Sequence, residues 1–304
     1  MSQPSPLIPL NGVAPLGSLG VIAAEGDEAA AFLHSQLTQD FALLGVSEAR
    51  LAALCTAKGR MLASFIAFKR AHDRILLVCR RDLLPPTLKR LQMFVLRAKV
   101  KLRDASDGFA LHGLAGQAVP AGLGAAPWTH LADGDTSAVR LYPGAGAPRA
   151  LWVGPAGTAP AGAALSEAQW DWLEVMSGVA TLGQAVVEAF VPQMLNYESV
   201  GGVNFKKGCY PGQEVVARSQ FRGTLKRRAY LVQADAPLQS GQDVFHASDA
   251  EQPTGTVVQA APNPQGGWNA IVSMQTGSAD GAPLRAGEAK LQLLPLPYPL
   301  LEDI

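Results

Sequence analysis

Residues 201–218 read GGVNFKKGCYPGQEVVAR and place one thiol, Cys209, among cations. The thiolate is the reactive form of cysteine, and nearby positive charge or a helix N-terminus raises its fraction. The charge comes from three basic residues of the stretch, Lys206, Lys207 and Arg218. Pro211 suits the first turn of a helix, because its missing N–H would be unpaired there anyway. The stretch therefore predicts a functional segment centred on a reactive cysteine.

Two glycines, Gly208 and Gly212, flank this cysteine and allow the backbone to bend or to approach a ligand or a second backbone closely. The competing interpretation is a buried structural cysteine in a tight turn, with its lysines merely solvated. The cations and the helix start favour the reactive thiol for Cys209. Cys55 and Cys79 lie inside apolar, strand-like runs and are predicted as core residues.

Bulk properties narrow the class of protein. A chain of 304 residues exceeds what one core usually holds, so two or three domains are expected. The 25 basic and 25 acidic residues cancel, which argues against broad affinity for nucleic acid or anionic membrane. Three widely spaced cysteines favour a reducing compartment. With neither a signal-peptide pattern nor an apolar run of membrane-spanning length, the sequence predicts a soluble cytoplasmic protein.

The first third of the chain has the pattern of an α+β unit. Residues 1–18, rich in Pro and Gly, are expected to form a loose arm, and Asp27 is expected to cap a helix that reaches about residue 37. Strand-like runs separated by turns predict an antiparallel meander, residues 51–56, 61–69 and 74–79. A helix over residues 83–96 and a strand over 99–103 follow. Helix, meander, helix and strand together indicate α+β.

The middle of the chain gives weaker signals. Short strands separated by Gly, Ala and Pro loops are expected over residues 108–151. Ser166 can start a helix that Gly178 ends. Trp170 and Trp172 on that helix point about 100° apart, so one is expected in the core while the other is free to line a pocket.

The last quarter predicts a small β-barrel, because alternating runs are split by Gly and Pro turns. These runs are residues 228–232, 243–246, 255–259, 268–272 and 289–293. The expected domains are 1–105, an α+β unit; 106–223, a second α+β unit that ends in the cysteine segment; and 224–304, the barrel. Arg222 and residues 226–228 form a short basic cluster without interleaved aromatics, which is typical of a solvated face. Direct contact with nucleic acid is therefore not predicted from this cluster.

The segment around Cys209 resembles the KGCYxGQE signature of the YgfZ family of folate-binding proteins. These proteins are relatives of the glycine-cleavage T-protein, an aminomethyltransferase, and of a mitochondrial iron–sulfur assembly factor. Further blocks resemble the family in the family's order: QLTQD at 36–40, AKGR at 57–60, VPQMLN at 191–196, VVAR to FRG at 215–223 and LPLPY at 294–298. Residues 108–165 carry little resemblance.

The resemblance implies a three-domain ring of the T-protein type, two α+β units plus a C-terminal β-barrel around a central hole that holds tetrahydrofolate. It implies support of iron–sulfur enzymes, including tRNA-modifying ones, with folate and iron–sulfur client enzymes or assembly proteins as partners of a monomer. By resemblance, Cys209 is the indispensable thiol and Lys207 acts beside it. The implied cofactor-binding residues are Trp170, which could stack on a pterin ring, Tyr210, Gln213, Glu214 and Arg218.

Two departures separate this chain from the T-protein. The T-protein carries an acidic pair in its hairpin strand, but residues 59–64 read GRMLAS and hold no carboxylate. The T-protein also has a pterin-binding glutamate two residues before the glycine that ends its helix. Met176 stands there, and a thioether cannot replace a carboxylate. The first departure argues against aminomethyl transfer and the second weakens the expected hold on folate.

Three functions compete at this point. The first is a folate-dependent accessory protein for iron–sulfur assembly or repair. One cysteine is too few for a cluster, which needs about four thiolates, so no stably bound metal or cluster is predicted. The second is a folate-dependent one-carbon transferase. The third is an RNA-binding module that acts on tRNA directly through Arg218 and the basic cluster, and the zero net charge argues against such contact with tRNA. The sequence favours the first.

Overall fold

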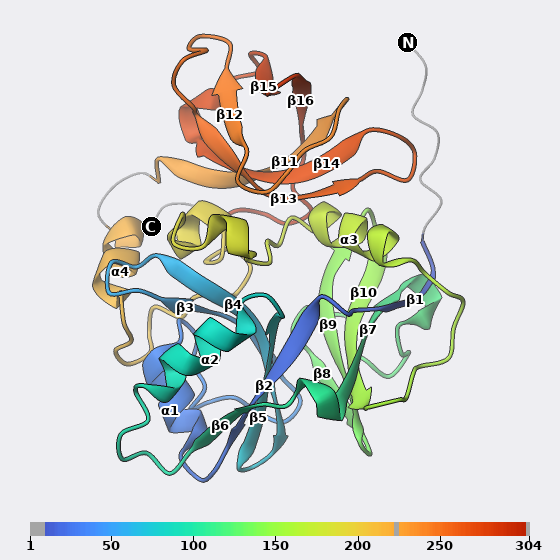
Figure 1. The fold of residues 1–304 in the computed structure, drawn as a ribbon, viewed down its shortest axis with the longest axis vertical. Helices are drawn as coiled ribbons and strands as arrows, with labels where there is room; N and C mark the ends of the chain where they lie inside the picture. The colour runs from blue at the N-terminus through green and yellow to red at the C-terminus, as the bar shows by residue number, and fades with distance from the viewer. Residues whose placement is uncertain (1–9, 222–224, 302–304) are drawn as a thin grey trace.

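Three β-sheets organise the part of the chain that the computed structural model describes, residues 10–221 and 225–301. Two are five-stranded antiparallel sheets and the third closes into a barrel. Figure 1 shows the barrel above, with the first sheet and its two helices at the lower left and the second sheet at the lower right. No helix among these residues is long and apolar enough to cross a membrane.

The first sheet has the strand order β3-β4-β5-β2-β6. Its strands are β2 (Leu19–Glu25), β3 (Ala49–Cys55), β4 (Met61–Ala71), β5 (Arg74–Arg80) and β6 (Lys101–Asp104). The predicted meander is confirmed, because β3 pairs with β4 and β4 with β5. Alternate residues of a strand point to opposite faces. One face of this sheet packs on its helices and the other on a core shared with the second sheet.

Helices α1 (Ala29–Gln36) and α2 (Leu84–Gln92) flank this sheet. Asp27 does not cap α1, since Glu28 holds the cap position and its side chain makes no capping bond. The expected helix over 83–96 ends early, at Gln92. The residues that follow it, among them Met93 and Leu96, are exposed, so no apolar stripe remains to hold a further turn against the sheet.

The second sheet has the order β1-β7-β10-β9-β8. Its strands are β1 (Gly12–Pro15), β7 (Phe109–Ala115), β8 (His130–Asp133), β9 (Thr136–Gly144) and β10 (Ala147–Pro155). The expected loose arm is wrong over β1, which pairs with β7. The local sequence did not predict this strand, because its pairing depends on β7, which lies about 100 residues further along the chain.

Helix α3 (Glu167–Met176) lies between the second sheet and the barrel. The predicted start is confirmed: Ser166 and Gln169 form a reciprocal capping box. Gly178 ends the helix with φ +67°.

The barrel closes in the order β11-β14-β13-β12-β15-β16. Its strands are β11 (Arg227–Ala234), β12 (Asp243–His246), β13 (Gly255–Pro262), β14 (Trp268–Gln275), β15 (Leu284–Ala286) and β16 (Ala289–Leu294). The sequence predicted five of these and missed the three-residue β15. The expected boundary at residues 223 and 224 lies outside the described residues.

Candidate functional site

The approach to the cysteine segment is fixed by residues of the QLTQD block. The buried Thr38 hydroxyl donates to the carbonyl of Gly202 at 2.6 Å and accepts from the amide of Ala53 at 2.8 Å. Gln39 Nε2 donates to the carbonyl of Gly201 at 2.8 Å. The QLTQD block and the cysteine segment, about 160 residues apart in sequence, are thereby joined. The segment contributes backbone carbonyls to these bonds, so its position here does not depend on its own side chains.

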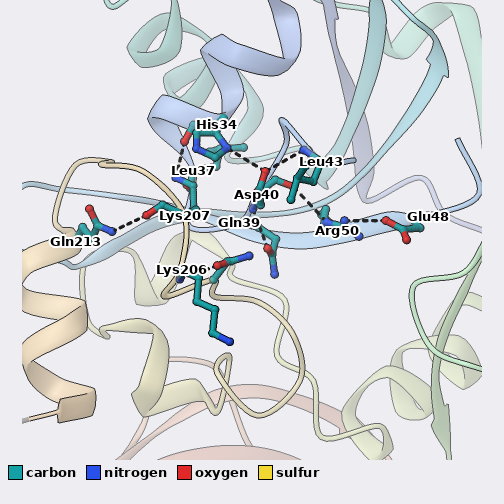
Figure 2. Close-up of polar contacts among 11 residues, drawn as sticks. His34, Leu37, Gln39, Asp40, Leu43, Glu48, Arg50, Lys206, Lys207 and Gln213 are labelled. Carbon is teal, nitrogen blue, oxygen red and sulfur yellow. Dashed lines mark hydrogen bonds and ion pairs between the residues drawn. The ribbon is translucent and has the colours of Figure 1, made fainter. Parts of the chain in front are cut away.

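Lys207 anchors the segment to the end of α1. Its side chain is buried, and Nζ donates to the carbonyl oxygens of His34 and, at 3.0 Å, of Leu37 (Figure 2). A cation is favourable at a helix C-terminus, where carbonyls lack helical partners. Nζ also lies 4.5 Å from the ring centre of Tyr210. Burial lowers the pKa of Lys207 to about 8. Lys207 was predicted to act beside the thiol. Its ammonium instead donates two hydrogen bonds that hold the cysteine segment against the end of α1.

Cys209 lies exposed on the surface. Helix α4 (Gln213–Phe221) starts only four residues later, so the expected helix start at Pro211 is wrong. Gln213 Nε2 reaches back to the carbonyl of Lys207, at 3.5 Å. The thiol is close enough to Lys207 to raise the pKa of that amine, against the larger effect of burial. Its environment is therefore a solvent-facing turn beside a partly buried cation.

The other two cysteines confirm their predicted place in the core. Cys55 and Cys79 are buried. Burial raises the pKa of each thiol to about 12. These thiols are therefore held protonated at neutral pH.

His34 and Asp40 lie beside the cysteine segment, and sequence analysis did not single them out. A Cβ at Gly208 would lie 3.3 Å from Nε2 of His34. Nδ1 of the same ring lies 3.1 Å from Oδ1 of Asp40 (Figure 2). Neither residue stands at a recognisable spacing from Cys209, so only the fold could bring them together.

The remaining residues of the segment divide between core and surface. Tyr210 is buried. Glu214 and Arg218 pair with each other across one turn of α4, with side chains 83% and 58% exposed. The structure thus places these two predicted cofactor contacts on an open helix face.

Both tryptophans of α3 are buried, so the expectation that one would be free to line a pocket is wrong. Trp170 is 1% exposed. The guanidinium of Arg149 lies 4.3 Å from its ring centre, and a Cβ at Gly113 would lie 2.4 Å from the ring. Trp172 donates through Nε1 to Oδ1 of Asn269 in the barrel, at 2.8 Å. Helix α3 is covered by the second sheet on one side and by the barrel on the other, and neither ring lines the central pocket between the two sheets.

A central pocket lies between the two sheets, with about 530 Å³ of empty space including its mouth. Apolar strand residues line most of it, and Trp128 and Tyr142 add two rings. Its polar lining comes from Ser64, Arg149, Glu174, Ser177 and Thr181. This mixture of apolar walls and a few polar groups is typical of small-molecule sites.

A buried ion pair forms part of the pocket wall. Arg149 is 2% exposed and donates through Nη2 to Oε1 of Glu174 at 3.3 Å. Burial lowers the pKa of Arg149 to about 10. Its Nε has no hydrogen-bond partner among the described residues. Met176 packs against the shared core, and the carboxylate that lines the pocket is that of Glu174, two residues earlier.

Trp128 connects the pocket to the surface near the cysteine segment. It also lines a shallow groove together with Gln39, Arg50 and Asn204. Its Nε1 donates to the carbonyl of Val200 at 2.8 Å. The ring therefore stands between the central pocket and the residues that precede Lys206. Sequence analysis missed it because it lies in the stretch without family resemblance.

The VPQMLN block joins α4 to the barrel. Gln193 Nε2 donates to the carbonyl of Val216 at 2.6 Å. The amide of Asn196 donates to the carbonyl of Ala229 at 2.9 Å and accepts from its N–H at 3.2 Å. The VPQMLN block therefore has a structural role, since it connects α4 to strand β11 of the barrel.

The basic cluster after α4 does not form one exposed surface. Arg228 is buried and donates to Oε1 of Glu198 at 2.7 Å. Arg227 donates to the carbonyl of Thr254 at 2.9 Å. Arg222 lies outside the described residues. Within the described ranges, no group of three or more His, Cys, Asp or Glu side chains is arranged to hold a metal ion.

Comparison with solved structures shows the fold. The glycine cleavage system aminomethyltransferase T from Bartonella henselae superposes with a TM-score of 0.72, covering 97% of this chain and 88% of that protein at 17% identity. At this identity the likeness concerns the fold alone. The predicted T-protein architecture, two α+β units and a C-terminal barrel, is confirmed.

Sequence comparison extends over nearly the whole chain. No protein-family model matches it. The tRNA-modifying protein YgfZ of Sodalis glossinidius (strain morsitans) is 31% identical, covering 98% of this chain and 96% of the relative. The tRNA-modifying protein YgfZ of Klebsiella pneumoniae (strain 342) is also 31% identical, covering 90% of this chain and 89% of the relative. Identity at this level along both full lengths, on the fold predicted from the same motifs, shows that the chain belongs to the YgfZ family.

Proposed function

We propose that the chain binds tetrahydrofolate in the central pocket and that its Cys209 segment supports iron–sulfur enzymes, including those that modify tRNA. The carrying observation is the pocket itself, with the rings of Trp128 and Tyr142 and one buried carboxylate–guanidinium pair in a largely apolar wall. The printed name of the relatives, tRNA-modifying protein, supports the link to tRNA modification.

The pocket fits the chemistry of a pterin. A pterin is flat, with apolar faces and an edge of N–H donors beside a carbonyl. The rings of Trp128 and Tyr142 suit such faces. The carboxylate of Glu174 can accept from the N–H edge, and Arg149 Nε has an unused donor.

When bound, folate supplies a carrier for one-carbon units, while the chain's own residues orient it and exclude water. One-carbon transfer to folate is the alternative function, and it needs a group that holds or moves a proton at the folate nitrogen. In the strand where the T-protein has its acidic pair, Ser64 lines the pocket and accepts from the amide of Leu182 at 3.0 Å. Glu174 is engaged by Arg149. These contacts favour binding over transfer.

Titration with tetrahydrofolate, followed by tryptophan fluorescence, tests the binding step. Wild type should show saturable quenching, and Glu174→Gln should bind about tenfold more weakly, which is about 1.4 kcal/mol. Glu167→Gln, a substitution at an exposed position on the same helix, is the matched control and should bind as wild type does. The absence of saturable quenching in folded wild type would remove folate from the function.

A second experiment tests the cellular role. In cells that lack the protein, the activity of an iron–sulfur tRNA-modifying enzyme should fall. Wild type should restore it, whereas Cys209→Ser should not. Full restoration by Cys209→Ser would overturn the role of the thiol, and turnover of a methylamine donor with tetrahydrofolate would replace the accessory role with one-carbon transfer.

A further inference from the structure

The tip loop, residues 93–100 between α2 and β6, carries three exposed apolar side chains. Met93 is 66% exposed, Phe94 42% and Leu96 86%. Single exposed apolar side chains are common on globular proteins, but three within four residues form a patch, and such patches mark sites of interaction. Figure 1 shows this loop at the lower left edge of the molecule, at the end away from the barrel.

The other residues of the tip loop hold it in place. Val95, Ala98 and Val100 pack against the core between the first sheet and its helices. The N–H groups of residues 94–96 each donate to a backbone carbonyl two or three residues earlier, at 3.0 or 3.1 Å. Paired backbone donors can enter an apolar medium at low cost. The loop therefore presents its apolar side chains on a fixed backbone whose donors are satisfied there.

Basic residues surround the tip loop. Residues 83–103 hold six of them and no acidic residue: Lys89, Arg90, Arg97, Lys99, Lys101 and Arg103. The guanidinium of Arg90 lies 5.9 Å from the ring centre of Phe94, so one cation stands directly beside the apolar side chains. Although the whole chain has zero net charge, this segment carries a local excess of positive charge.

Several of these cations lack a partner within the molecule. Lys89, Arg97 and Lys99 are exposed and form no ion pair with another described residue. Glu25 engages two arginines, at 2.9 and 3.1 Å. Glu28 accepts from the backbone amide of Lys99 at 2.6 Å. The carboxylates that contact this region thus leave three basic side chains beside the tip loop unpaired.

We propose that the tip loop binds the surface of an anionic lipid bilayer, with Met93, Phe94 and Leu96 inserted among the headgroups and the surrounding cations on lipid phosphates. An apolar tip bordered by Lys and Arg matches the two layers at the boundary of a bilayer, which are hydrocarbon and negatively charged headgroups. The inference goes beyond the proposed function, and neither folate nor Cys209 plays a part in it.

Two other partners fit the tip loop less well. The phosphates of an RNA would attract the cations but would leave Met93 and Leu96 in water, and a single aromatic ring offers little base stacking. A protein partner would cover the apolar side chains. Lysine, however, is depleted in protein interfaces, and three of the six basic residues are lysines. The combination of residues therefore favours lipid.

Flotation of the full chain with lipid vesicles tests the proposal. Phosphatidylcholine vesicles with about 30% phosphatidylglycerol should carry the wild type at low salt, whereas phosphatidylcholine alone should bind it at least about tenfold less. Because salt screens exposed charges, the partition coefficient on the anionic vesicles should fall about tenfold or more between about 0.05 M and about 0.5 M NaCl.

Two double variants separate the apolar contribution from the charge. Phe94→Ser combined with Leu96→Ser should lower the partition coefficient about tenfold or more, because insertion is lost. Arg97→Gln combined with Lys99→Gln should lower it about 25-fold, since each cation near an anionic surface contributes about fivefold. All four side chains are exposed, so the urea midpoint of both variants should stay at the wild-type value.

Matched controls come from other surfaces of the molecule. Leu43 is 77% exposed, and Leu43→Ser removes an apolar side chain outside the tip loop. Arg285→Gln combined with Lys290→Gln removes two exposed cations from the barrel. Both controls should float as wild type does.

Insertion itself can be measured with Phe94→Trp. Phosphatidylcholine brominated near the top of its acyl chains, mixed into the anionic vesicles, should quench the added indole. The emission of wild type should not change with the same vesicles, because the tip loop of the natural chain holds no tryptophan.

The outcomes that would overturn the proposal are specific. Folded wild type that does not float with anionic vesicles at low salt excludes lipid binding. Flotation that persists in the Phe94 and Leu96 double variant excludes insertion, and flotation that persists in the Arg97 and Lys99 double variant excludes the role of the cations. Binding of tRNA instead of vesicles, lost only in the Arg97 and Lys99 variant, would assign the tip loop to RNA.

Discussion

Gly212 of the cysteine segment packs directly on Gly59 of the turn between β3 and β4. A Cβ at Gly212 would lie 2.8 Å from the Cα of Gly59 and 2.4 Å from the carbonyl oxygen of Thr56. Both glycines have positive φ, +84° and +71°. Two blocks of family resemblance, AKGR and KGCYxGQE, therefore touch backbone to backbone, and a side chain at residue 212 has no room.

Gly212→Ala should destabilise the protein by about 2–4 kcal/mol, since backbone strain and a steric clash act together. Gly157→Ala is the matched control: Gly157 has a similar φ of +78°, but a Cβ there meets nothing within 4 Å. It should cost only about 1–2 kcal/mol for the left-handed conformation. Urea denaturation measures both. Equal losses would show that the close approach to Gly59 carries no energy.

The stability of the protein should rise with pH in alkaline solution because of Lys207. Burial lowers the pKa of this amine to about 8 from 10.5. Between about pH 8 and about pH 10.5, the unfolded chain binds a proton that the folded chain has lost, so the free energy of unfolding increases with pH. The full effect is at most about 3 kcal/mol. Lys207→Met should remove this increase. We would measure urea unfolding of both proteins at several pH values, and parallel curves would contradict the assignment.

Removing one partner of the Arg149–Glu174 ion pair in the pocket wall should destabilise the fold strongly. Arg149→Met should destabilise the protein by about 3–5 kcal/mol, because it leaves the partly buried Glu174 without its partner. Arg149→Met combined with Glu174→Gln should recover much of that loss. Denaturation of the two single variants and the double variant gives the coupling. Additive losses would mean that the two side chains stabilise the fold independently.

Fluorescence quenching by tetrahydrofolate should come from Trp128. Trp128→Phe should lose most of the quenching because this ring lines the pocket. Trp170→Phe should retain the quenching, since its ring is covered by Arg149 and Gly113. Trp170→Ala should instead destabilise the fold by about 3–5 kcal/mol through the cavity that it leaves. If folded Trp170→Phe lost the quenching, Trp170 rather than Trp128 would be the ring that contacts folate.

Local patterns predicted the local features well. The Ser166–Gln169 capping box, the meander of the first sheet and five strands of the barrel are readable because each depends on neighbouring residues. Strand β1 and the depth of Trp170 were not readable, because both depend on partners far along the chain.

The site divides in the same way. The cysteine segment stood out through its unusual residues, whereas the pairing of Arg149 with Glu174 and of His34 with Asp40 exists only after the sheets assemble. Nothing in the spacing of these residues indicates that they meet.

Strand β1 is synthesised first, yet its partner β7 follows only after residues 16–108, which include the whole first sheet. During translation the first sheet can therefore form while β1 is still single, and the second sheet becomes complete later. A proteolytic cut just after Pro15 would leave one edge of β7 with free N–H and C=O groups, and such an edge invites pairing with a neighbouring chain. The four residues of β1 thus cover an edge of β7 that would otherwise be open to pairing.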